Sequence, residues 1–81
     1  MNAKRKGIAR VQGGWVHYYL VTEEANDGVE YGLSLRYGTE EVTVPKLGLA
    51  GEEVCALLKT MLRGKVTPVA VWDVVEDWLC R

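Results

Sequence analysis

The sequence predicts an α+β fold, in which an antiparallel three- to four-stranded meander is followed by two helices packed on one face. Residues 29–37 alternate apolar and polar side chains with a period of two, which is typical of a half-buried strand. Residues 54–62 instead carry an apolar stripe with helical spacing, and Thr67-Pro68 is typical of a helix start. Strands that come first and helices that come after them indicate an α+β domain.

The first predicted hairpin joins a short strand at residues 8–12 to a longer strand at residues 15–23. Gly13-Gly14 lies between them, and tight hairpin turns need residues that accept a positive φ. The longer strand is rich in aromatic and β-branched side chains, which suit a pleated surface.

This second strand is apolar on both of its faces. One face carries Val16, Tyr18 and Leu20. The other face carries Trp15, His17, Tyr19 and Val21. The length of the loop near residues 26–28 decides which set is buried, because a shift of one residue exchanges the two faces. We expect the first set to face the core, which leaves the second set on the far face of the sheet.

The third predicted strand covers residues 29–37, and Gly38-Thr39 turns the chain into a shorter fourth strand at residues 41–44. Pro45 is expected to end this fourth strand, since proline cannot donate a hydrogen bond to a strand ladder. The next predicted element is a helix over residues 51–63, with Glu52 and Glu53 at its positive end.

The last predicted element is a helix that begins with Thr67 as its N-cap and Pro68 as its first residue. Its apolar residues cover about 160° of arc, which is wider than one flat contact needs. We therefore expect it to pack on both the sheet and the preceding helix, with Trp72 and Trp78 on opposite flanks of the arc.

The chain has 81 residues and a formal net charge of -1, which indicates one domain without a general attraction to nucleic acid or anionic membranes. Its first basic residues are Lys4, Arg5, Lys6 and Arg10. We expect residues 1–7 to form a flexible basic N-terminus and residues 8–81 to form a single small α+β domain. A core of this size supplies only about 3–5 kcal/mol, so a second copy of the chain would add stability.

The start of the chain lacks the apolar region of a signal peptide, and no apolar run approaches the roughly 20 residues of a membrane span. We therefore expect a cytoplasmic protein without membrane contact. Cys55 and Cys80, the only two cysteines, are then expected to be reduced thiols. Geometry decides whether they lie near enough to form a disulfide.

No motif in the sequence predicts an enzyme, a metal site or a cofactor. His17 is the only histidine, so it has neither the Cys/His spacing of a zinc site nor a second histidine to work with. Asp73, Glu76 and Asp77 have helical spacing, which is typical of a solvated acidic face. Gly13-Gly14 lacks the longer glycine pattern of a phosphate-binding loop.

The far face of the second strand favours a binding role, because exposed aromatic patches usually mark interaction surfaces. The competing interpretation is that a helix end or the basic N-terminal segment covers these side chains. We predict a non-enzymatic protein–protein interaction or regulatory module, which forms a homodimer or binds another protein. The predicted partner surface comprises Trp15, His17, Tyr19, Asp73, Glu76 and Asp77.

The alternative prediction is a single-stranded nucleic-acid binder. In that case bases stack on Trp15, His17 and Tyr19, while the basic residues at positions 4–6 and 10 contact phosphates. The net charge of -1 disfavours this alternative.

Several short segments carry a resemblance to a known family. They are Tyr18-Tyr19-Leu20, Tyr31-Gly32, the leucine-rich residues 54–62, and Val66-Thr67-Pro68 followed by Asp73-Val74-Val75-Glu76-Asp77-Trp78-Leu79. On these segments the chain resembles a family of short uncharacterised bacterial proteins, a domain of unknown function, over roughly residues 18–79. The connector Leu47-Gly48-Leu49-Ala50-Gly51 departs from it by lacking a polar N-cap. The resemblance implies no activity and no catalytic residues.

Overall fold

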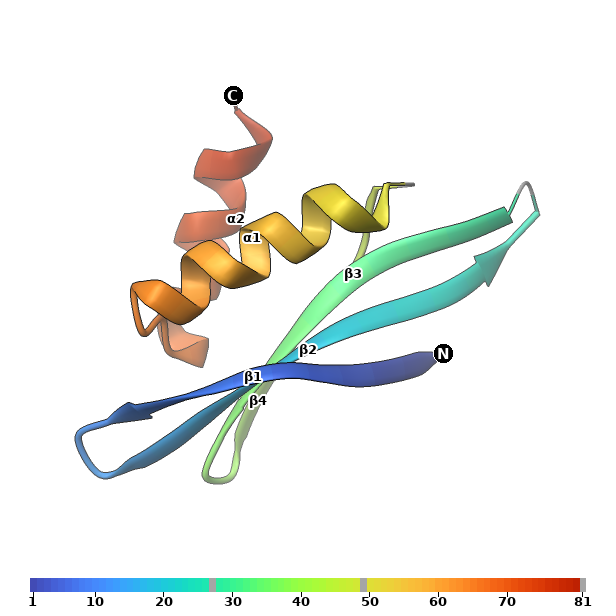
Figure 1. Ribbon diagram of the computed structural model, residues 1–81. Helices are drawn as coiled ribbons and strands as arrows, with labels where there is room; N and C mark the ends of the chain where they lie inside the picture. Colours follow the sequence, from blue (N-terminus) through green and yellow to red (C-terminus); the bar gives the residue numbers. More distant parts are fainter. Residues whose placement is uncertain (27, 49, 81) are drawn as a thin grey trace.

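A computed structural model describes residues 1–26, 28–48 and 50–80 of the chain (Figure 1). The strands β1 (Asn2–Val11), β2 (Gly14–Ala25), β3 (Gly28–Tyr37) and β4 (Glu40–Gly48) form one antiparallel sheet in the order β1-β2-β3-β4. Helix α1 (Gly51–Arg63), a short 3-10 helix η1 (Pro68–Ala70) and helix α2 (Val71–Leu79) follow and lie on one side of the sheet. The predicted α+β meander with two helices on one face is confirmed.

The register between β2 and β3 decides which face of β2 is buried. Tyr18 lies opposite Leu35 and Leu20 lies opposite Leu33, so these side chains share the face that the helices cover. Val16 and Tyr18 are completely buried there, and Leu20 packs against the core. The expected inward set of β2 is therefore confirmed, and the opposite set lies on the uncovered face.

The first strand is longer than the sequence predicts. It begins at Asn2 instead of residue 8, so residues 2–7 belong to the strand, and all of them except Lys6 pair with β2. Pairing between backbones does not require apolar side chains, and lysine and arginine suit a strand at the edge of a sheet. The register shifts between Arg5 and Gly7, which makes Lys6 the extra residue of a β-bulge.

The fourth strand is also longer than expected, since β4 continues through Pro45 to Gly48. Proline is accepted in an edge strand because its missing N–H can point away from the neighbouring strand. The register shifts again at this point, between Tyr31 and Leu33, and Gly32 lies against the backbone of β4. A Cβ atom on Gly32 would overlap the carbonyl oxygen of Val44. The bulged strand therefore depends on a residue without a side chain at position 32.

The helices close the core over the inner face of the sheet. Helix α1 matches its predicted bounds, and its buried side chains are Val54, Leu57, Leu58 and Met61. The second helical segment starts as the 3-10 helix η1 and becomes α-helical at Val71. The Thr67 side chain makes no capping hydrogen bond, whereas its backbone oxygen accepts one from the N–H of Ala70.

Helix α2 packs less completely than its apolar arc predicts. Val71 and Val75 are buried and Trp78 packs against the core, but Trp72 remains 52% exposed. The helix has only nine residues and rises away from the sheet toward the C-terminus (Figure 1). The flank that carries Trp72 therefore reaches solvent, so the expectation of a packed tryptophan on each flank holds only for Trp78.

Candidate functional site

The face of the sheet opposite the helices, here called the outer face, is not covered by either helix in the described structure. The strand pairing places fifteen side chains on it: Ala3, Arg5, Ile8, Arg10, Trp15, His17, Tyr19, Val21, Glu23, Ala25, Glu30, Ser34, Arg36, Glu41 and Thr43. Three of the six residues of the predicted partner surface, all from β2, thus lie together on this face.

Aromatic and aliphatic side chains extend from the centre of the outer face to its end near the β1–β2 turn. Trp15 is 47% exposed and Ile8 is 42% exposed, while His17 and Tyr19 are half-buried between them and the neighbouring strands. The rings of His17 and Tyr19 stack with centroids 6.5 Å apart and planes inclined by 23°. The Arg10 guanidinium lies over the Trp15 ring, 5.7 Å from its centroid, at cation–π distance.

The part of the outer face formed by β3 and β4 is polar and satisfies its own hydrogen bonds. The hydroxyls of Ser34 and Thr43 are hydrogen-bonded at 3.1 Å. Arg36 donates to the Glu41 carboxylate at 2.7 Å from Nη2 and 3.0 Å from Nε. This charge-assisted hydrogen bond raises the pKa of the Arg36 guanidinium above its ordinary value, so Arg36 stays a paired cation.

Two buried polar atoms on the outer face have no hydrogen-bond partner among the described residues: Nδ1 of His17 and Oε2 of Glu23. Both residues belong to β2, and both point away from the helices. A buried donor or acceptor without a partner costs about 1–3 kcal/mol. Neither atom is accessible to solvent, so a hydrogen-bonding group from outside reaches it only when the side chain turns outward.

The two ends of the outer face carry opposite charge. Arg10 pairs with Trp15 at the end near the β1–β2 turn, whereas Glu23 pairs with Glu30 at the end near the β2–β3 turn. Trp15 and Glu23 each lie four residues from Tyr19 along β2, which corresponds to about 13 Å at ~3.3 Å per residue. Tyr19 thus lies midway between the two ends of the face, and these two ends carry opposite charges.

The remaining residues of the predicted partner surface lie elsewhere. Asp73, Glu76 and Asp77 are exposed on α2, in the helical layer on the other side of the sheet. The structure therefore does not bring these acids together with the aromatic side chains of β2. Sequence spacing identified both groups, but the strand register and the helix layer separate them into two surfaces.

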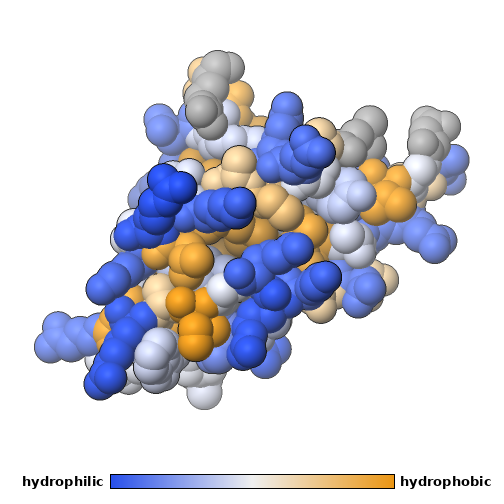
Figure 2. Space-filling model, viewed as in Figure 1, coloured by the Kyte–Doolittle hydropathy of each residue, from blue (hydrophilic) through white to orange (hydrophobic). Residues whose placement is uncertain are grey.

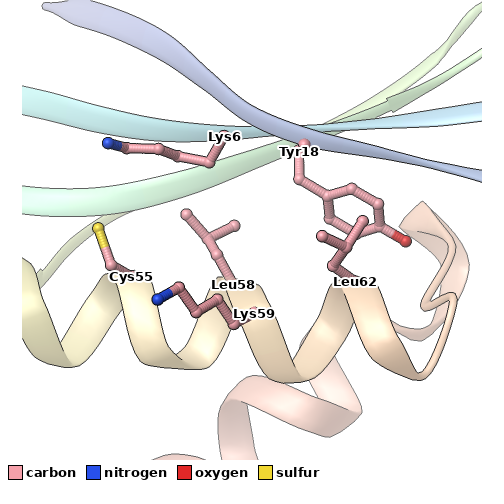
Figure 3. Close-up of a pocket in the computed structure, with 7 residues that line it drawn as sticks. Lys6, Tyr18, Cys55, Leu58, Lys59 and Leu62 are labelled. Atoms are coloured by element: carbon pink, nitrogen blue, oxygen red, sulfur yellow. The ribbon is translucent and has the colours of Figure 1, made fainter.

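A pocket of about 200 Å³ lies between β1 and α1, on the helix side of the sheet (Figure 3). It is lined by Lys6, Gly7, Tyr18, Cys55, Leu58, Lys59 and Leu62. Figure 3 shows Lys6 extending along its strand and Lys59 along the facing helix, while Cys55 is directed from that helix toward the sheet. Side-chain patterns in the sequence do not indicate this site, because Lys6 faces the helix only as a consequence of the bulge in β1.

The two cysteines have separate environments. Cys55 lines the pocket and is half-buried, Cys80 is exposed beyond α2, and both are free thiols. Within residues 1–26, 28–48 and 50–80, no three His, Cys, Asp or Glu side chains are grouped closely enough to hold a metal ion. Over the same residues, every helix is too short or too polar to cross a membrane.

The mixed character of the surface is visible in Figure 2, where hydrophilic side chains surround apolar atoms on the face that presents β1.

No curated protein and no solved structure matches the chain. A family model does match it, and its range includes β1 from residue 3 onward as well as the segments that carried the resemblance. The chain belongs to this family, described as a Family of unknown function (DUF6514), which covers residues 3–81.

Proposed function

We propose that this chain is a non-enzymatic protein–protein interaction or regulatory module of the cytoplasm, and that its outer face binds a second copy of the same chain. One observation carries the proposal. Half-exposed Trp15 and Ile8 lie on the same face as the two unpartnered buried atoms, His17 Nδ1 and Glu23 Oε2. A partner that covers this face would bury the apolar side chains, and it would supply the missing hydrogen bonds once the His17 and Glu23 side chains turn toward it.

The total surface of the chain supports an uncovered binding face. Its solvent-accessible area is 5455 Å², whereas a compact monomer of 9.0 kDa exposes about 4,900 Å². Four strands are roughly 19 Å wide and nine residues of strand roughly 30 Å long, so the outer face offers on the order of 600 Å² in projection. Because side chains protrude from the sheet, the accessible area of the face exceeds this projected area and comes near the ~800 Å² per partner of a standard interface.

The charge layout favours a second copy over an unrelated partner. A two-fold axis through Tyr19, lying in the interface and perpendicular to β2, reverses the strand direction between the two copies. The axis brings Arg10 of each copy toward Glu23 of the other copy, which gives two equivalent pairs of opposite charge. Glu23 Oε2 lacks a partner within the described part of the chain, and it would accept a hydrogen bond from this guanidinium once the Glu23 side chain turns outward.

The apolar contribution to such a dimer is dominated by Trp15. About half of a side chain that contributes ~200 Å² would be removed from water, which is worth about 2.5 kcal/mol in each protomer. Tryptophans that an interface buries are frequent hot spots, whereas the surrounding polar contacts mainly fix the orientation. We therefore assign affinity to Trp15 and orientation to the charges at the two ends.

A double-mutant cycle tests this geometry. Arg10 and Glu23 are about 26 Å apart within one chain, since Arg10 pairs with Trp15 eight residues before Glu23. Their effects should therefore add unless a second copy brings them together. We expect Arg10→Glu and Glu23→Arg each to weaken dimerisation about tenfold, and the double variant to recover most of the affinity. Strictly additive losses in dimer affinity would contradict the proposed arrangement.

The second candidate function is binding of single-stranded nucleic acid. Two contacts favour it: the Arg10 guanidinium over the Trp15 ring, and Arg5 paired with Tyr19 in the strand register. Bases could stack on these rings while the arginines contact phosphates. The same Glu23→Arg variant separates the two candidates, because added positive charge should strengthen oligonucleotide binding while it weakens the dimer. Absent or salt-independent binding of a mixed oligonucleotide pool rejects this second candidate.

A further inference from the structure

The pocket between β1 and α1 exists because the strand is irregular there. Lys6 is the extra residue of the β1 bulge, and a bulge redirects the side chain of the residue it adds. Gly7 follows directly, and a Cβ atom at this position would lie only 2.9 Å from Cδ2 of Leu62. The missing side chain thus lets α1 approach the strand, while the bulge directs Lys6 to the opening.

The lining of this pocket divides into an apolar floor and a cationic rim. Leu58 and Leu62 are adjacent on α1 and form the floor together with the ring of Tyr18. The Tyr18 hydroxyl points away from the pocket and donates to the Val66 carbonyl oxygen at 2.7 Å. The floor therefore offers ring carbons and methyl groups instead of a polar group.

The rim carries two ammonium groups and no carboxylate. Lys6 comes from β1 and Lys59 from α1, and their amines extend to the same side of the pocket (Figure 3). No aspartate or glutamate lines the pocket, and neither lysine forms an ion pair within the described residues. Two like charges at one opening repel each other, and an anion placed between them relieves that repulsion.

We infer that this pocket binds a small organic carboxylate whose apolar tail has about six carbon atoms. The volume of about 200 Å³ is somewhat larger than the ~150 Å³ apolar cavity that accepts benzene, so a chain or ring of this size fits. The tail contacts Leu58, Leu62 and the Tyr18 ring, and the carboxylate lies between Lys6 and Lys59. The site faces the helices, so it is independent of the outer face and of dimerisation.

Hexanoate is a direct probe of this site. In methyl-resolved NMR spectra, millimolar hexanoate should shift the signals of Leu58 and Leu62 in a saturable manner and leave those of the exposed Leu79 unchanged. Hexylamine has the same number of carbon atoms and the opposite charge, and it should give no saturable shift. Equal responses to hexanoate and hexylamine, or no response to hexanoate at millimolar concentration, would overturn the inference.

Substitution of Lys59, one of the two rim lysines, tests the role of the rim, and substitution of Lys65 is the matched control. Lys59→Gln keeps the length and removes the charge, and it should weaken hexanoate binding about threefold or more, as expected for a partly exposed ion pair. Lys65→Gln removes an exposed lysine outside the pocket lining and should leave the affinity unchanged. Equal affinity of Lys59→Gln and the unmodified chain would show that the rim does not recognise the carboxylate.

The thiols give a second readout in the same molecule. Bound hexanoate should slow alkylation of Cys55, which lines the pocket, several-fold relative to alkylation of the exposed Cys80. Mass spectrometry of the two cysteine peptides measures both rates in one sample. Equal slowing at both thiols would indicate a general effect of the reagent mixture and would count against the site.

Discussion

The buried hydroxyl of Tyr18 gives the sharpest test of how the helices are fixed to the sheet. Tyr18 lies in β2 with no exposed surface, and its Oη donates to the Val66 carbonyl oxygen just before η1, 48 residues further along the chain. Tyr18→Phe removes this hydrogen bond and leaves a carbonyl without that donor. We expect the free energy of unfolding to fall by about 1–2 kcal/mol. At ~4–8 °C per kcal/mol for a domain of this size, Tm should fall by roughly 4–16 °C.

Tyr37 supplies the matched control for this substitution. Its hydroxyl also donates to a backbone carbonyl, that of Gln12 at 2.8 Å, but this hydrogen bond is exposed to solvent. Water can replace the lost donor there, so Tyr37→Phe should cost about 0.5 kcal/mol or less. Urea unfolding followed by circular dichroism, at one fixed protein concentration, measures both variants. A loss for Tyr18→Phe no larger than that for Tyr37→Phe would refute the argument.

Two further predictions follow from the same core. Burial raises the pKa of the Tyr18 phenol above 10.0, so the stability that this neutral group contributes should be complete below pH 10 and should be lost as the pH rises through its folded-state pKa. When the free energy of unfolding is measured against pH, Tyr18→Phe should lose less stability at alkaline pH than the unmodified chain. Identical alkaline losses in the two proteins would contradict this prediction. Gly32→Ala should cost about 2 kcal/mol or more because its methyl group would overlap the β4 backbone. Gly48→Ala is the control, since a Cβ atom there meets nothing within 4 Å.

Local patterns in the sequence were sufficient to predict most of the fold. The period of two over residues 29–37 identified β3, and the helical stripe identified α1 with its observed bounds, because both patterns reflect which side chains one element buries. The inner face of β2 was expected correctly, but the sequence left both faces open, because the length of the loop sets the register with β3. These predictions depend on neighbouring segments and not on distant ones.

The ends of the edge strands could not be predicted in the same way. Lys4 and Arg5 belong to β1 because the long β2 offers them backbone partners, and Pro45 stays in β4 because its neighbour Gly32 accommodates a bulge. Backbone pairing of this kind leaves no pattern in the side chains of the edge strand itself. Polar composition therefore suggested a tail where the structure has a strand.

The candidate sites show the same division. The aromatic outer face was predictable, since β2 is apolar on both faces and one helical layer can cover only one of them. The pocket was not predictable, because it depends on a one-residue bulge in β1. This bulge places Lys6 opposite Lys59 of α1, which is more than fifty residues away in the sequence. Exposure of Trp72 was also missed, since the tilt of α2 follows from packing and not from its periodicity.

The mass of the protein in solution tests the central claim, that the outer face binds a second copy, most directly. Sedimentation equilibrium over micromolar concentrations should give the mass of two chains for the unmodified protein. Trp15→Ser removes about 2.5 kcal/mol from each protomer and should give the mass of one chain. Trp72→Ser removes a similarly exposed tryptophan from α2 and should stay dimeric. A single-chain mass for the unmodified protein throughout this range, or dissociation caused by Trp72→Ser and not by Trp15→Ser, would contradict the account.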